Sequence, residues 1–158
     1  MPAITPCLWF QTEAAEAAQF YTGLFPNSRI LRTTFFGEGA HMPTGAVMAV
    51  ELELMGQQYL ALNGRPPFPF NEAVSLIVPC ETQAEIDHYW QSLTAEGGQP
   101  VQCGWLKDKY GVSWQITPTQ MADWASDSNP AKARAVFSAM MSMVKIDLAT
   151  LQSAYDAA

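Results

Sequence analysis

Residues 73–98, "AVSLIVPCETQAEIDHYWQSLTAEGG", join a short apolar run to a capped helical pattern. Thr82 and Glu85 have the spacing of a capping box, in which each side chain accepts a hydrogen bond from the backbone at the helix start. Apolar side chains then recur at the i, i+3, i+4, i+7 spacing of a helix that lies on a core. They are Ile86, Tyr89, Trp90 and Leu93. Gly97 and Gly98 end the pattern, so a strand followed by an amphipathic helix is predicted.

The same unit occurs near the start of the chain. Residues 4–10, "ITPCLWF", predict a short apolar strand, and Thr12 is the expected N-cap of a helix over 13–24. The apolar positions of this helix are Ala17, Phe20, Tyr21 and Leu24. Its aromatic pair recurs 69 positions later, counted from Phe20 to Tyr89. This spacing indicates an internal repeat.

Strand-like sequence follows each predicted helix. The segments are 29–36, 45–54, 58–63, 99–106 and 112–118. A turn at Gly56-Gln57 joins two of them as a hairpin. Each module therefore has the order βαβββ, and the second has shorter strands. We predict an α+β fold in which the paired modules form a curled mixed sheet, with module one at 4–63, a proline-rich linker at 64–72 and module two at 73–118.

A helical tail is predicted over residues 119–158. Asn129-Pro130 starts one helix with proline at its first position, and Asp147 caps a final short helix. The apolar stripe of the longer helix comprises Ala133, Val136, Phe137, Met140 and Val144. Four of the eight methionines lie in the tail. We interpret them as core packing, and a surface that grips a ligand or partner is the alternative.

Composition narrows the class of protein. The 158 residues are 49% hydrophobic and 15% charged, which is typical of a globular domain. The net charge is −7 and the eight basic residues are scattered, so no basic stripe is available for nucleic acid. No run reaches the ~18 apolar residues of a membrane span, and the start lacks a signal-peptide pattern. A cytoplasmic protein is expected.

The three cysteines, Cys7, Cys80 and Cys103, are an odd number without a CxxC pair. We interpret them as small buried hydrophobic residues in a reducing compartment. A nucleophilic or redox role stays open as an alternative, although no histidine lies near any of them in sequence.

Four strings narrow the fold to one superfamily. They are "ITPCLWF…FYTGLFPNS", "LNGRPPFPFNEAVSLIVPC", "CGWLKDKYGVSWQITP" and "AVFSAMMSMVKIDLATLQSA". The chain resembles the PhnB-like branch, also named the 3-demethylubiquinone-9 3-methyltransferase type, of the vicinal-oxygen-chelate superfamily (glyoxalase/bleomycin resistance/dioxygenase). The resemblance implies two βαβββ modules curled into a cup, and association into a homodimer.

The methyltransferase name can be tested on the residues. A Rossmann-type methyltransferase needs a glycine-rich turn between a strand and a helix. The nearest candidate, "FFGEGAHMPTG" at 35–45, lies between two strand-like segments. It predicts a hairpin loop, so the chain is not expected to be a Rossmann-type methyltransferase.

The resemblance also implies metal positions, because many members of the superfamily hold a divalent ion with His and Glu ligands. These positions fall on Pro6, Ser75, Gln115, and Leu60 or Ala61. At most one of them is a moderate ligand, so we predict no metal and no other cofactor.

Four other titratable residues have possible roles. The two histidines, His41 and His88, are expected on the surface. Glu51 and Glu53 share one face of a predicted strand, where they face either solvent or the cup and could act as acid and base.

The stretch 103–118 is interpreted as a hairpin. Asp108 is expected to hydrogen bond to the turn backbone before Gly111. Lys107 and Lys109 are expected to be solvated, or one of them could face an anionic ligand at the rim. Strand alternation places Trp114 under a helix and Gln115 in the cup.

By the same alternation, seven residues are predicted to bind a ligand: Leu8, Phe10, Asn63, Ser75, Ile77, Trp105 and Gln115. A mostly apolar cup with few neutral polar groups is typical of a small-molecule site. The favoured hypothesis is a metal-free protein that binds a small, partly apolar molecule. The alternatives are a metal-assisted lyase, isomerase or dioxygenase, and a dimeric scaffold protein.

Overall fold

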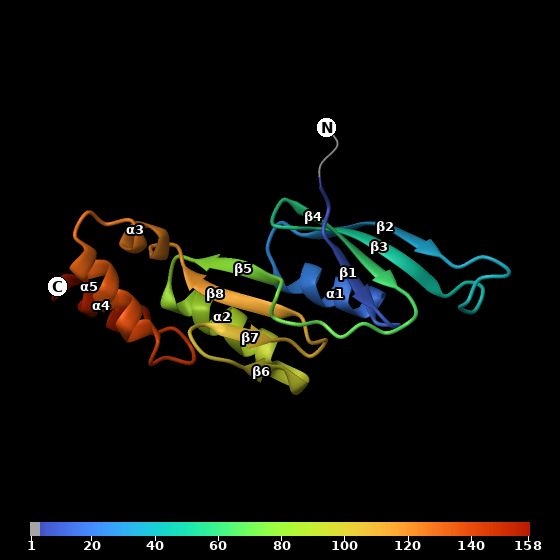
Figure 1. Cartoon of the computed structure of the whole chain (residues 1–158). Helices are drawn as coiled ribbons and strands as arrows, with labels where there is room; N and C mark the ends of the chain where they lie inside the picture. Colours follow the sequence, from blue (N-terminus) through green and yellow to red (C-terminus); the bar gives the residue numbers. More distant parts are fainter. Residues whose placement is uncertain (1–3) are drawn as a thin grey trace. The chain divides into compact units, whose positions relative to one another are not determined.

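A computed structural model describes residues 4–158 of the chain (Figure 1). The chain divides into two compact units, one ending at residue 69 and the other beginning at residue 70, which lies within the expected linker. Each unit contains a four-stranded mixed sheet and follows the order βαβββ. The predicted α+β class is therefore confirmed. Among residues 4–158, no helix has both the length and the apolar character needed to cross a bilayer.

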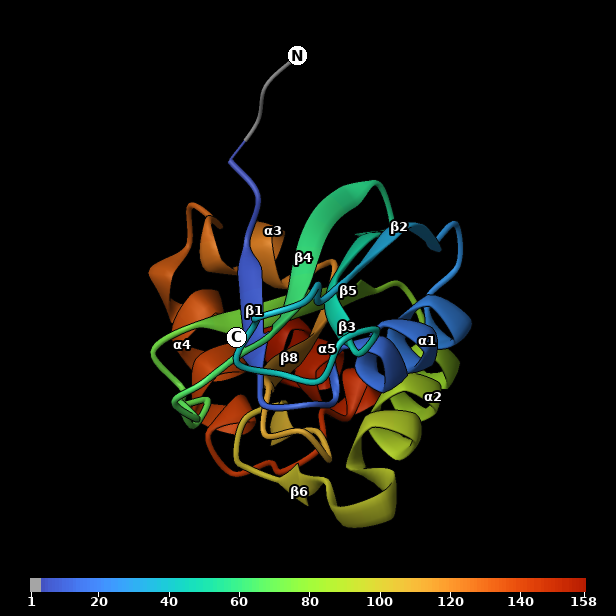
Figure 2. The same cartoon turned by 90° about the vertical axis from the view of Figure 1, so that its right-hand side faces the viewer.

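Unit one consists of five elements. They are β1 (Cys7–Phe10), α1 (Ala14–Leu24), β2 (Arg29–Phe35), β3 (Val47–Leu54) and β4 (Gln57–Asn63). The sheet order is β1-β4-β3-β2, and β1 runs parallel to β4 (Figure 2). A two-residue turn joins β3 to β4, with positive φ at both Met55 (48°) and Gly56 (88°). This is a type I′ turn, whose twist suits a hairpin. The turn lies one residue earlier than the predicted Gly56-Gln57 pair.

Helix α1 covers one face of the unit-one sheet. The strand residues on this face are paired side by side, with Leu8 next to Ala61 and Ala61 next to Val50. All three are buried, as are Tyr21 of α1 and Leu52 of β3. Burial of this apolar surface is the main stabilising contribution in unit one. The other face is called the open face of unit one below.

The start of α1 is capped by a residue that is distant in sequence. The predicted cap, Thr12, is not the N-cap residue; Glu13 holds that position, and its side chain makes no cap hydrogen bond. Instead, the Asn63 carboxamide oxygen accepts a hydrogen bond from the Ala14 backbone N–H at 2.9 Å. The Asn63 side-chain nitrogen also donates to the Val47 carbonyl at 3.0 Å. The last residue of β4 thus fastens α1 to the sheet.

Unit two repeats this order. Its elements are β5 (Ser75–Cys80), α2 (Gln83–Thr94), a short 3₁₀ helix (Ala95–Gly97), β6 (Gln99–Pro100), β7 (Trp105–Lys107) and β8 (Ser113–Pro118). The sheet order is β5-β8-β7-β6, with β5 parallel to β8. The predicted capping box of Thr82 and Glu85 is confirmed. Leu106, Trp114 and Ile116 are buried in the core beneath α2.

Three helices complete unit two: α3 (Met121–Ala125), α4 (Pro130–Met140) and α5 (Leu148–Asp156). The predicted caps Asn129 and Asp147 are confirmed, since each side chain accepts a hydrogen bond from a first-turn backbone N–H. Helix α4 packs against α5. Its predicted stripe is only partly buried, because Val136 is enclosed whereas Phe137 is exposed. Val144, the last member of the predicted stripe, lies beyond the end of α4 at Met140 and is also exposed.

The methionines of the tail do not form a closed core. Met141 is exposed, and Met121, Met140 and Met143 are half-buried. The interpretation of the methionine cluster as core packing is therefore wrong for Met141 and only partly right for the others.

Candidate functional site

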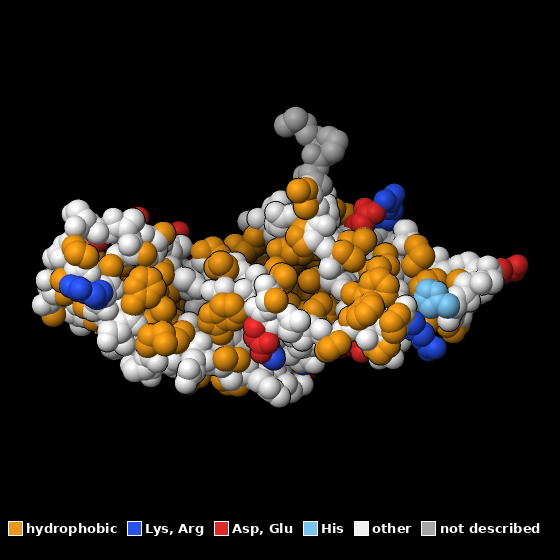
Figure 3. All heavy atoms as spheres, viewed as in Figure 1, with side chains coloured by type: hydrophobic (Ala, Val, Ile, Leu, Met, Phe, Trp, Pro, Cys, Tyr) orange, Lys and Arg blue, Asp and Glu red, His pale blue; other side chains and the backbone are white. Residues whose placement is uncertain are grey.

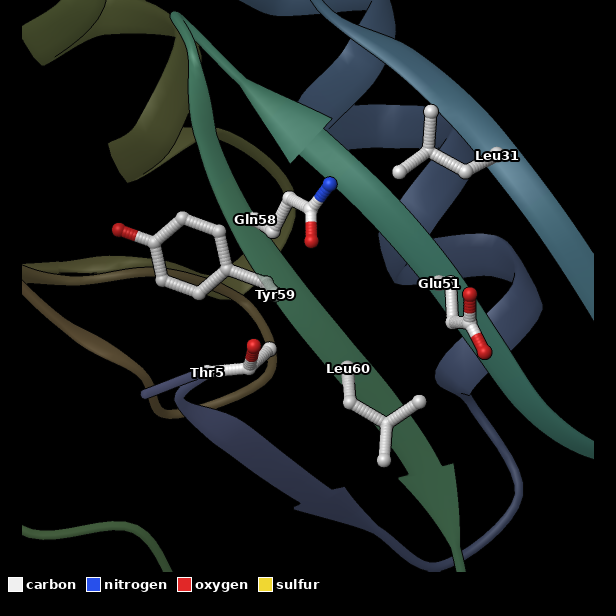
Figure 4. A pocket seen from close by; sticks show the side chains of 6 residues that line it. All are labelled: Thr5, Leu31, Glu51, Gln58, Tyr59 and Leu60. Atoms are coloured by element: carbon white, nitrogen blue, oxygen red, sulfur yellow. The ribbon is translucent and has the colours of Figure 1, made fainter. Parts of the chain in front are cut away.

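A hollow of about 290 Å³ lies on the open face of unit one (Figure 4). Strands β2, β3 and β4 and the residue two positions before β1 line it. The lining residues are Thr5, Leu31, Glu51, Gln58, Tyr59 and Leu60. Two leucines and four polar residues give the mixed lining that small-molecule sites have.

A β-bulge shapes one wall of this hollow. In the ladder between β2 and β3, Ile30 pairs with Leu52 and Arg32 pairs with Glu51, so Leu31 is an extra residue. A bulge bends its strand and changes the direction of nearby side chains. Leu31 consequently lines the hollow, while Arg32 stays beside Glu51.

The two predicted acid–base candidates each have a basic partner. Both the Nε and the Nη2 of Arg32 donate to Oε1 of Glu51. Glu53 forms an ion pair with Arg29, at 3.5 Å between Nη2 and Oε1. Figure 3 shows acidic and basic side chains beside hydrophobic ones on the surface of this unit. Both glutamates alternate with the buried Val50 and Leu52 along β3, so they sit on the open face, and Glu51 lines the hollow.

Tyr59 is the other titratable residue of the hollow. Partial burial of its ring raises the pKa of the phenol above its usual value. The register of β3 and β4 pairs Tyr59 with the buried Leu52 and pairs Leu60 with Glu51, so the Tyr59 side chain leaves β4 on the opposite face from Leu60. Figure 4 shows the Tyr59 ring pointing away from Glu51 and Leu31.

Three of the seven predicted ligand-binding residues lie away from the open faces. Leu8 and Phe10 are 7% and 3% exposed and belong to the face that α1 covers. Their predicted orientation is corrected, because Cys7 and Trp9 occupy the open-face positions of β1. Asn63 is predicted near the mouth of the cup but is buried, where it caps α1.

The part of the open face nearest Trp9 is covered by the segment that follows β4. The Trp9 indole N–H donates to the Pro66 carbonyl at 3.2 Å, and the Phe68 ring stands edge-on to it at 5.5 Å between centroids. A Cβ at Gly64 would lie 2.4 Å from the Trp9 ring, so only glycine fits at this crossing.

The other four predicted residues share the open face of the unit-two sheet, the face opposite α2. Ile77 and Trp105 pair with Gln115 from either side. The Gln115 carboxamide nitrogen donates to the Ser75 hydroxyl at 2.8 Å. Ile77 is 62% exposed. Their common face is confirmed, while ligand contact stays a prediction.

Ser113 and Lys107 lie on the same open face of the unit-two sheet. Ser113 lies between Ser75 and Lys107 in the register of β5, β8 and β7. Its hydroxyl is buried and has no hydrogen-bond partner among the described residues. The Lys107 ammonium pairs with the Glu72 carboxylate at 2.5 Å, and this contact lowers the pKa of Glu72. Lys107 is thus paired with a carboxylate of its own unit, not solvated alone.

The turn before β8 is built around Asp108, as predicted. Its Oδ1 accepts hydrogen bonds from the backbone N–H groups of Tyr110 (2.9 Å) and Val112 (3.0 Å). Its Oδ2 accepts from the Trp114 indole N–H at 2.8 Å, a contact that the sequence does not indicate. Asp108 is only 3% exposed. The carboxylate is therefore a structural group of the hairpin.

The cysteines differ in burial, and both histidines lie on the surface. Cys80 is buried, Cys103 is half-buried and Cys7 is exposed, so the expectation of three buried thiols is correct only for Cys80. Burial raises the pKa of the Cys80 thiol to about 12. His41 and His88 are both exposed, as expected.

Comparison with known proteins identifies the family. The model of the 3-demethylubiquinone-9 3-methyltransferase family matches residues 2–117. The chain belongs to this family. The PhnB protein of Bacillus cereus is 35% identical, with a TM-score of 0.69, over 75% of this chain and 100% of that one. The family match ends before the tail, whereas the resemblance drawn from the sequence includes a string of the tail.

Two more distant structures share the fold. A Pseudomonas aeruginosa protein has a TM-score of 0.61 at 20% identity, over 75% of this chain and 98% of that one. The fosfomycin resistance protein FosX of Listeria monocytogenes has a TM-score of 0.51 at 10% identity, over 75% and 93%. The chain is thus a PhnB-like member of the vicinal-oxygen-chelate superfamily. No curated protein matches the chain.

The side chains at the superfamily's metal positions do not fit a divalent ion. The sequence assigns these positions to Pro6, Ser75, Gln115, and Leu60 or Ala61. Pro6 is corrected, because the register of β1 and β4 puts Cys7 beside Leu60 on the open face of unit one. Ser75 and Gln115 lie on the open face of unit two. Gln115 and Ser75 are hydrogen bonded to each other. Within residues 4–158, no three His, Cys, Asp or Glu side chains are grouped so that they could hold a metal. A catalytic site of three protein ligands cannot be assembled from these donors.

The glycine-rich segment has the expected role. It connects β2 to β3, which are antiparallel neighbours, and the Phe36 and Gly45 backbones are hydrogen bonded across it. A nucleotide-type cofactor loop instead joins a strand to the N-terminus of a helix. The segment is therefore a hairpin loop.

Proposed function

We propose that this PhnB-like protein binds a small, partly apolar molecule in the hollow of unit one, without a divalent metal. The observation that carries the proposal is the 290 Å³ hollow lined by Leu31, Leu60 and four polar residues. Its size suits a compact molecule, since drug-sized ligands occupy clefts of ~300–1,000 Å³. The leucines supply apolar contact and the polar groups orient the ligand.

The arrangement of charges also favours binding over acid–base catalysis. Glu51 and Glu53 are each paired with an arginine, so neither is an isolated carboxylate of the kind that abstracts a proton. The Asp108 carboxylate is fully engaged in its turn. The hollow therefore provides recognition by shape, hydrogen bonding and apolar contact.

A fragment titration followed by backbone amide NMR tests the proposal. Small cyclic alcohols added in the presence of a chelator should produce saturable shifts at Leu31, Glu51 and Leu60. Leu60→Trp fills the hollow and should abolish them, whereas Leu62→Trp, at a neighbouring open-face position outside the hollow, should preserve them. Saturable binding that Leu60→Trp leaves intact would refute the location.

The homodimer, including a role for the helical tail, stays a prediction. Removal of residues 119–158 followed by a measurement of molar mass in solution tests it. A change from dimer to monomer would support the tail as the interface, and an unchanged dimer would exclude it.

A further inference from the structure

One oxygen of Glu51 is left available in the hollow. Arg32 uses both Nε (3.1 Å) and Nη2 to bind Oε1 of Glu51. Among the described residues, no hydrogen bond reaches Oε2. The Glu51 side chain is 39% exposed, and it lines the hollow with Leu31 and Leu60 (Figure 4). A carboxylate oxygen accepts strong hydrogen bonds, so Oε2 is the principal open acceptor there.

The charge of Glu51 is already balanced. The Arg32 guanidinium lies directly against the carboxylate, and a second ion pair, Arg29–Glu53, stands beside it on the same face. A cationic ligand would meet Arg32 at close range, and like charges repel. A neutral ligand with an O–H or N–H donor would bind Oε2 without this penalty.

The remaining walls define the other half of the ligand. Leu31 and Leu60 favour an apolar body, and the Thr5 hydroxyl and the Gln58 carboxamide add polar groups that can rotate to suit it. We propose that the hollow selects a compact neutral molecule that combines an apolar body with a hydrogen-bond donor, and that Oε2 of Glu51 accepts from this donor. The inference rests on the proposed binding function and specifies its ligand class.

A matched pair of probes tests the selection. Cyclohexanol carries a hydroxyl donor, whereas cyclohexanone has nearly the same shape but only an acceptor. Each is titrated into the full chain and followed by the amide shifts of Leu31 and Leu60. We expect cyclohexanol to bind about tenfold more tightly, the effect of one added hydrogen bond to a charged acceptor.

Glu51→Gln should change this preference. Its carbonyl oxygen can keep the contact with Arg32, which places the amide N–H₂ where Oε2 was. The open acceptor becomes a donor, so cyclohexanone should then bind at least as tightly as cyclohexanol. Glu53→Gln is the matched control, because it removes the neighbouring carboxylate outside the hollow. It should leave the preference unchanged.

A second variant does not depend on the stability of Glu51→Gln. Arg32→Gln removes the guanidinium and leaves Glu51 as an isolated carboxylate. Cyclohexylammonium, which should bind the wild type poorly, should bind this variant at least tenfold more tightly at low salt. An unchanged affinity would overturn the assigned role of the Arg32–Glu51 pair.

The outcomes separate the two proposals. Equal binding of cyclohexanol and cyclohexanone to the wild type, or an unchanged preference in Glu51→Gln, would overturn the donor selection and leave small-molecule binding intact. Failure of every probe to bind the hollow would contradict the binding function as well.

Discussion

Asp108→Asn is the substitution whose effect follows most directly from the structure. The carboxylate uses one oxygen for the backbone N–H groups of Tyr110 and Val112 and the other for the Trp114 indole. Asparagine has the same shape but only one acceptor oxygen. If that oxygen serves the backbone, the new amide N–H₂ faces the indole N–H, and two donors meet in a buried site.

The magnitude can be worked from these contacts. A hydrogen bond to a charged group contributes about 1.5–3 kcal/mol, and a buried donor left without a partner costs about 1–3 kcal/mol. Because these two effects overlap, we expect the free energy of unfolding to fall by about 2–4 kcal/mol. Urea unfolding followed by tryptophan fluorescence measures it. Asp123→Asn, on the exposed surface of α3, should change stability by less than about 0.5 kcal/mol.

A double-mutant cycle isolates the indole contact. Trp114→Phe removes the N–H donor, so it should cost less in the Asp108→Asn background than in the wild type. We expect a coupling energy of at least about 1 kcal/mol. An Asp108→Asn protein as stable as the wild type, or additive effects in the cycle, would refute the reasoning.

Three further predictions concern single positions. Asn63→Ala should lower the free energy of unfolding by about 1–3 kcal/mol, because the buried Ala14 N–H loses its cap; urea unfolding checks this, and an unchanged midpoint would contradict it. Cys80 should resist iodoacetamide at pH 8, as peptide mass mapping can show. The pKa of the Cys80 thiol is about 12 in the folded chain and 9.0 ordinarily, so the contribution of this thiol to stability is present below pH 9 and lost as the pH rises toward 12. Between pH 9 and pH 12, Cys80→Ala should therefore lose less stability than the wild type. Gly104→Ala should lower the melting temperature, since its φ is +83° and a Cβ would approach Ile146 to 2.9 Å; an unchanged value would contradict this.

Local signals in the sequence predict the element order well. The capping box of Thr82 and the proline after Asn129 act through residues within one helical turn, and both are present in the structure. Asp108 likewise binds a turn that begins two residues later. The order βαβββ depends on such local patterns and is therefore readable in both modules.

The face of β1 is harder to predict, because "CLWF" is apolar on both sides. When no polar residue marks the open face, the alternation of side chains cannot show which residues of the strand face the core. The aromatic pairs indicate a repeat offset of 69, but the buried member of each pair is the tyrosine. Tyr21 and Tyr89 lie 68 positions apart. This offset makes Cys7, not Pro6, the counterpart of Ser75, and Trp9, not Leu8, the counterpart of Ile77.

The hollow itself depends on contacts that one sequence does not reveal. The bulge at Leu31 is a register shift between strands, and Asn63 caps a helix 49 residues earlier in the chain. Glu51 is recognisable as a candidate, but its pairing with Arg32 requires the register of β2 on β3. In the sequence, the charged residues within the otherwise largely apolar strands β2 and β3 are the feature that points to this site.

The central claim is that the hollow binds a small organic molecule without a metal. Native mass spectrometry of the purified chain, before and after dialysis against a chelator, tests it most directly. We predict a bound small molecule that survives the chelator, is lost in Leu60→Trp and is not accompanied by a stoichiometric divalent ion. A stoichiometric metal whose removal releases the small molecule would contradict the account.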